Sequence, residues 1–124
     1  MTLELRLEWH DTVPVARVKG EVDIATSARL RDELLGELSN REFVLVLDLS
    51  QTTYLDSAGV NVMFELAERL GYRQQRLVVV MPESGLVTRV LKLVDASSAM
   101  SIKPTLEDAL RYAGALESDV LRFD

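Results

Sequence analysis

The chain has 124 residues, of which 48% are hydrophobic and 27% charged, a composition typical of one soluble globular domain. Its formal net charge of −6 argues against general binding to nucleic acid or anionic membranes, since both need basic surface. The absence of cysteine excludes disulfides, thiolate chemistry and cysteine-based zinc sites. No apolar run approaches the length of a membrane span, and the N-terminus lacks the apolar segment of a signal peptide. We therefore expect a cytoplasmic protein without membrane insertion.

The first predicted elements are two strands joined by a short turn. Residues 3–9 alternate apolar and charged side chains, which is typical of a half-buried strand. After a turn at 10–12, a second strand is predicted over 13–19 and ends at Gly20. The following stretch, "GEVDIATS", is predicted to be a loop because it combines glycine with small and polar residues.

A helix and a central strand are predicted next. Thr26 or Ser27 can cap a helix that carries three leucines on one face, namely Leu30, Leu34 and Leu38. Residues 43–49, "FVLVLDL", form a nearly continuous apolar run, which predicts a strand covered on both faces. The segment "SQTTYLD" is predicted to be the loop that leads to the second helix.

The second half of the chain predicts alternating helices and strands. A helix follows "SQTTYLD" with Gly71 as its C′ residue, and its apolar positions are Val60, Met63, Phe64, Ala67 and Leu70. Residues 76–81 predict another buried strand, Ser84 can cap a short third helix, and 100–102 form a weak strand.

The last predicted helix begins after Pro104, where Thr105 and Asp108 have capping-box spacing. Residues 117–124 resemble an extension or tail, so we expect one domain over 1–116. The whole pattern predicts an α/β fold in which a mixed sheet of about five strands packs against about four helices.

The sequence offers no enzyme site. A serine nucleophile needs a base, and the only histidine, His10, lies on the polar side of the first strand. Ser57 is followed by Ala-Gly, without the Gly-x-Ser-x-Gly elbow, and Gly59 belongs to no phosphate-binding loop. The acidic residues show no metal-binding spacing. We therefore predict no catalytic residue, no metal and no cofactor.

The start of the second helix, "DSAG", admits two interpretations. In the first, Asp56 or Ser57 is an N-cap worth about 1 kcal/mol, which leaves Gly59 unexplained. In the second, Ser57 is a modification site, because a helix N-terminus favours an added anion and a phosphoryl group adds about −1.5 to −2 charges. Ala58 and Gly59 would then keep the surface low around the hydroxyl, and Asp23 would make it more acidic.

The chain resembles the bacterial anti-sigma factor antagonists, which are built on the STAS domain. "VKGEVDIATSARLRDEL" looks like the family's Gly-Glu-apolar-Asp segment and first helix, and "PTLEDAL" like the start of its last helix. The most specific match is "VLVLDLSQTTYLDSAGVNVM", which contains the family's Asp-Ser-x-Gly motif. The resemblance covers essentially the whole chain and implies a single STAS-type domain.

The resemblance also implies a function. In this family the unphosphorylated antagonist binds an anti-sigma factor that is also a serine kinase, and so frees the sigma factor. Phosphorylation of the motif serine, here Ser57, weakens this binding, and a serine phosphatase restores it. The implied partner-binding residues are Asp23, Ile24, Thr26, Asp56, Ser57, Gly59, Val60 and Asn61. Among the apolar residues nearby, Val22 is expected in the core, and Ile24 and Val60 could also belong there.

Two other functions stay open. STAS domains also serve as interaction modules without a switch, in regulatory, transporter-associated or stress-sensing assemblies. Nucleotide binding or a weak hydrolase activity is a further possibility, although the sequence has no phosphate loop. The presence of Asp56, Ser57 and Gly59 together favours the switched antagonist.

Overall fold

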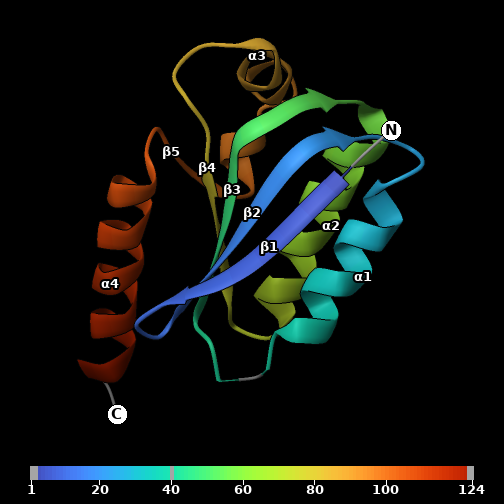
Figure 1. Ribbon diagram of the computed structural model, residues 1–124. Helices are drawn as coiled ribbons and strands as arrows, with labels where there is room; N and C mark the ends of the chain where they lie inside the picture. Colours follow the sequence, from blue (N-terminus) through green and yellow to red (C-terminus); the bar gives the residue numbers. More distant parts are fainter. Residues whose placement is uncertain (1–2, 40, 123–124) are drawn as a thin grey trace.

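The computed structural model describes residues 3–39 and 41–122 and shows an α/β fold (Figure 1). The elements follow in the order β1 (Leu3–His10), β2 (Val13–Val22), α1 (Ser27–Glu37), β3 (Val44–Leu55), α2 (Ser57–Tyr72), β4 (Arg76–Val80), α3 (Leu86–Leu93), the 3-10 helix η1 (Ala96–Ser98), β5 (Ser101–Lys103) and α4 (Leu106–Arg122). The described residues thus form five strands and four α-helices, which confirms the predicted fold class.

The five strands form one mixed sheet in the order β1-β2-β3-β4-β5. The pair β1 and β2 is an antiparallel hairpin in which His10 faces Val13, so that only Asp11 and Thr12 form the turn. Asp11 has a φ of 56°, a left-handed conformation that tight hairpin turns favour. All other pairs are parallel, so the carboxyl ends of β2, β3 and β4 lie at the same end of the sheet.

Both faces of the sheet are covered by helices (Figure 1). The larger core lies under α1, α2 and α3, which contribute buried residues such as Leu34, Leu66 and Leu91. On the opposite face α4 covers the valines of β2, β3 and β4 with Ala109 and Ala113. The strand predicted over 43–49 is therefore buried on both faces, as expected of an apolar run.

Two segments that were predicted to be loops belong to the sheet. Gly20 does not end β2, which continues to Val22, and the residues of "SQTTYL" extend β3 to Leu55. Here β2 and β3 pair with register shifts, and Gly20 has a φ of 106°, a conformation that suits such an irregularity. Thr52 Oγ1 donates to Val18 O at 2.9 Å. The prediction failed because these extensions begin with glycine and polar residues, and they return to apolar residues only at Val22 and at Tyr54 and Leu55.

Helix ends were predicted with mixed success. Gly71 is not the C′ residue, because α2 continues to Tyr72 and Gln74 adopts the left-handed conformation with a φ of 60°. Ser84 does not cap α3, whose N-cap is Gly85. The capping interaction at α4 is confirmed, since Asp108 N donates to Thr105 Oγ1 at 3.1 Å. This helix runs on through 117–122, and 123–124 lie outside the described residues.

Candidate functional site

Ser57 is the first residue of α2 and is exposed at the carboxyl ends of the parallel strands. The N-cap is Asp56, whose Oδ1 accepts from Gly59 N at 3.0 Å. No described residue hydrogen-bonds Ser57 Oγ. Of the two candidate caps, Asp56 therefore caps the helix, and the interpretation of Ser57 as a cap is wrong.

Asp56 also connects α2 to the loop that follows β2. Its Oδ2 accepts from Ile24 N at 3.1 Å, and its own backbone N–H donates to Val22 O at 3.3 Å. One carboxylate thus accepts hydrogen bonds from two backbone amides that are far apart in the sequence. This arrangement places the loop over 23–26 directly beside the start of α2.

The loop over 23–26 is held by its own polar residues. Asp23 Oδ1 accepts from Ala25 N at 2.9 Å and from Thr26 N at 3.1 Å. The buried Thr26 Oγ1 accepts from Asp23 N at 3.0 Å and lies 2.9 Å from Glu21 O, to which it can donate. Thr26 occupies the N-cap position of α1 as predicted, although its side chain makes no capping hydrogen bond to the helix.

These hydrogen bonds determine which apolar side chains face the solvent. Ile24 is 83% exposed, whereas Val22 is 1% and Val60 8% exposed. Val22 and Val60 therefore belong to the core, and Ile24 does not. Ile24 therefore presents an apolar side chain to solvent from a loop that is held by hydrogen bonds.

Gly59 has a structural role that the sequence did not reveal. A Cβ at this position would lie 2.6 Å from both Val22 O and Leu55 Cδ1. The glycine is buried and lets the first turn of α2 pack against the ends of β2 and β3. The expectation that it keeps the surface around Ser57 low is therefore wrong; it permits close packing below that surface.

The predicted site residues thus fall into two groups. The exposed or partly exposed group is Asp23, Ile24, Asp56, Ser57 and Asn61, and the buried group is Thr26, Gly59 and Val60. Asn61 lies one helical turn after Ser57, on the same face of α2. Sequence reasoning missed Tyr54, which is 43% exposed near the end of β3 and two residues before Asp56. No alternation marks it, because Thr53 and Tyr54 are both exposed in this part of β3.

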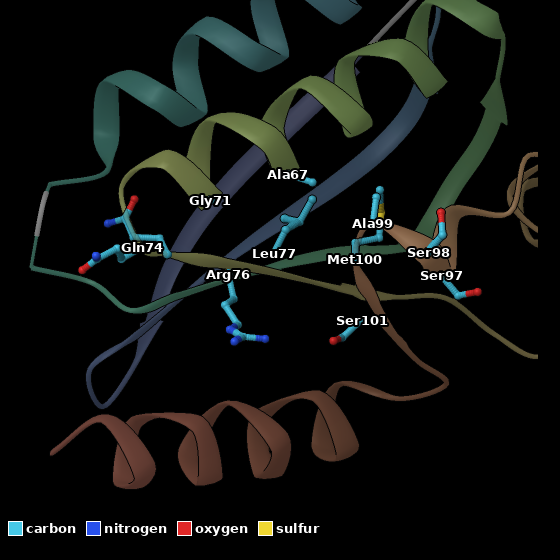
Figure 2. Close-up of a pocket in the computed structure, with 11 residues that line it drawn as sticks. Ala67, Gly71, Gln74, Arg76, Leu77, Ser97, Ser98, Ala99, Met100 and Ser101 are labelled. Carbon is cyan, nitrogen blue, oxygen red and sulfur yellow. The ribbon is translucent and has the colours of Figure 1, made fainter. Parts of the chain in front are cut away.

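A separate hollow of about 610 Å³ lies at the other end of α2 (Figure 2). Gly71 and Gln74 line it from that end of the helix, and Arg76, Ser97 and Ser101 line it from the following segments. Ser57 does not contribute to this hollow. The predicted site residues lie instead around the loop over 23–26 and the start of α2.

The structure adds two observations about alternative kinds of site. Residues 3–39 and 41–122 contain no group of three or more histidine or acidic side chains placed to hold a metal ion. Within the same residues, no helix has the length and apolar character that crossing a bilayer requires.

Comparisons with known proteins identify the family that the chain resembles. Residues 5–104 match the family model described as "Mlab, STAS domain". An anti-sigma-F factor antagonist of Mycobacterium tuberculosis, RsfB, is 30% identical over 102 residues, which cover 82% of this chain and 81% of the relative. An anti-sigma-B factor antagonist of Listeria monocytogenes is 27% identical over 103 residues and covers 82% of this chain and 87% of its own length.

A solved structure gives the same result for the fold. The crystal structure of an anti-sigma factor antagonist from Mycobacterium paratuberculosis superposes with a TM-score of 0.76 at 28% identity. The match covers 90% of this chain and 94% of that one. The family model and the relatives together show that the chain belongs to the STAS domain family, among its anti-sigma factor antagonists.

Proposed function

We propose that the chain is a phosphorylation-switched antagonist of an anti-sigma factor. In its unphosphorylated form it binds an anti-sigma factor with serine kinase activity and frees the sigma factor. Phosphorylation of Ser57 releases the partner, and a serine phosphatase reverses the modification. The chain acts by binding in the cytoplasm and catalyses no reaction. The observation that carries the proposal is the exposed Ser57 hydroxyl, which takes no part in the cap of its own helix.

The charges around Ser57 explain how a phosphoryl group would act. Asp56 directly precedes Ser57, and Asp23 lies in the loop that Asp56 holds at the start of α2; both carboxylates accept from local backbone amides. A phosphoryl group adds about −1.5 to −2 charges to the surface around Ser57. Dipoles at the start of α2 stabilise part of that charge, and the rest repels an acidic partner surface or disrupts a close contact.

Phosphorylation is tested by incubating the chain with each anti-sigma kinase of the source organism and Mg-ATP, followed by phosphopeptide mass spectrometry. We expect phosphate on Ser57 and its loss in Ser57→Ala. Thr53→Ala is the matched control, because Thr53 is an exposed hydroxyl residue nearby, and it should remain a substrate. No phosphate on the folded protein with any of the kinases would contradict the switch.

Binding to the same kinase gives an independent prediction. Ser57→Ala should bind at least as tightly as the wild type, whereas Ser57→Glu should weaken binding by about tenfold or more through like-charge repulsion. Ser97→Glu adds the same charge at an exposed serine of η1, near the hollow of Figure 2, and should leave the affinity unchanged. Calorimetric titration measures all three, and equal affinity for Ser57→Glu and the wild type would remove the switch.

The second candidate function is an interaction module without a switch. The exposed side chains of Ile24 and Tyr54 suit a binding surface with or without a phosphorylation switch. They therefore support this function and the switched antagonist equally. The two functions differ in one result. A module without a switch would bind its partner through the same surface. Ser57 would then not be phosphorylated, and Ser57→Glu would not weaken the binding.

A further inference from the structure

The strand β1 forms one edge of the sheet and has eight residues, whereas the opposite edge, β5, has three. In an antiparallel hairpin, alternate residues direct their backbone groups toward the neighbouring strand and away from it. Because His10 and Val13 close the turn, the even-numbered residues of β1 direct their backbone N–H and C=O groups toward β2. These residues are Glu4, Arg6, Glu8 and His10. The odd-numbered residues of β1 therefore direct their N–H and C=O groups outward.

Little of this edge is covered within the described residues. Leu3 O accepts from Arg29 Nη2 at 3.1 Å, and no comparable bond reaches the outward groups of Leu5, Leu7 or Trp9. The strand contains no proline, and its pairing with β2 shows no bulge, so two devices that natural proteins use to protect an edge are absent. Such a strand is a template for a second strand.

The side chains of β1 indicate what kind of strand fits. On one face the signs alternate along Glu4, Arg6 and Glu8, followed by His10. On the other face Leu5 and Leu7 are partly buried, and Trp9 is 50% exposed. Arg6 faces Arg17 across the hairpin and forms no ion pair with a described residue, whereas Glu8 pairs with Arg17 at 2.9 Å and bonds to His10 at 2.8 Å.

We propose that two copies of this chain pair through β1 in antiparallel orientation, with Leu7 facing Leu7 across the two-fold axis. In this register Arg6 lies opposite Glu8 of the second copy, and Glu4 lies opposite His10. Cross-strand pairs of opposite charge stabilise a sheet, and here each pair occurs twice by symmetry. Trp9 covers Leu5 of the second copy, which buries part of its exposed ring.

Neighbouring registers are less favourable. Centring the pair on Arg6 places the two Arg6 side chains opposite each other and Glu4 opposite Glu8. Centring it on Glu8 opposes the two Glu8 carboxylates, and like charges directly opposite destabilise a sheet. Centring it on Leu5 restricts the overlap to about residues 3–7 and requires Leu3 O, which already accepts from Arg29. Of these four registers, only the one centred on Leu7 avoids opposing like charges without depending on Leu3 O.

The test is the oligomeric state of the full chain by sedimentation equilibrium, from micromolar to millimolar concentration. We expect a reversible dimer. Arg6→Glu should raise its dissociation constant by about tenfold or more, because two attractive pairs become repulsive. Glu8→Arg should act in the same way, and its thermal unfolding must be measured too, because the change also removes the Glu8 contacts with Arg17 and His10. An equimolar mixture of the two variants should form a heterodimer, since every 6–8 pair is then complementary.

Two controls separate pairing from folding. Lys19→Glu changes a charge on β2, beside Glu4 and away from the paired edge, and should leave the dissociation constant within about twofold of wild type. Arg6→Glu places a carboxylate opposite Arg17, so its thermal unfolding should match the wild type. A wild-type chain that stays monomeric at millimolar concentration would overturn the proposal. Unchanged dimerisation in Arg6→Glu, or a mixture that stays monomeric, would also overturn it.

Discussion

Gly59→Ala is expected to lower the free energy of unfolding by about 3 kcal/mol, near the upper end of what overpacking usually costs. The added methyl group would lie 2.6 Å from Val22 O, a backbone atom that also accepts from Asp56 N. This carbonyl cannot move without losing its hydrogen bond, and Val22 is itself paired with Leu55 in the sheet. The start of α2 would have to shift instead, and chemical denaturation measures the resulting loss.

Gly71→Ala is the matched control in the same helix. Apart from its chain neighbours and the backbone of its own helix, no atom lies within 4 Å of a Cβ at Gly71, and its φ lies outside the left-handed range. Alanine is favoured over glycine in a helix by about 0.5–1 kcal/mol, so this variant should be more stable than the wild type. Equal effects of the two substitutions would show that the cost at Gly59 is not one of close packing.

The core of the fold could be predicted because its signals are local. The alternation in β1 and the apolar runs of β3 and β4 identify strands by their period and composition alone. The extensions of β2 and β3 escaped prediction, since their polar residues and glycine look like a loop until the two chain segments pair. Pairing at the shifted register is a tertiary interaction that no single segment encodes.

The residues of the candidate site stay a prediction from the resemblance, and their structural roles could not be predicted from the sequence. The resemblance identified Asp23, Asp56 and Ser57, and the structure brings the loop over 23–26 and the start of α2 together. The assignment of Asp56 as the N-cap of α2 depended on the hydrogen bond from Gly59 N to Asp56 Oδ1. The role of Gly59 depended on a backbone carbonyl of β2, 37 residues earlier in the chain, and the sequence gives no sign of that contact.

Asp56→Ala is expected to lower the free energy of unfolding by about 2 kcal/mol, because two backbone amides lose a charged acceptor. The affected amides are those of Gly59 and Ile24, at 3.0 Å and 3.1 Å from the two carboxylate oxygens. Amide hydrogen exchange should therefore accelerate at both residues together. Asp56→Asn retains one acceptor oxygen, so it should lose about half as much stability and expose only one of the two amides.

Ser57→Ala serves as the neighbouring control. The Ser57 hydroxyl bonds to no described residue, and alanine is the better helix former, so stability should be unchanged or slightly higher. A loss as large as that of Asp56→Ala would contradict the assignment of the cap. If Asp56 acts as described, its substitution also loosens the loop that carries Ile24. The Asp56 carboxylate therefore holds together the proposed partner-binding surface. The Ser57 hydroxyl takes no part in these hydrogen bonds and stays available for modification.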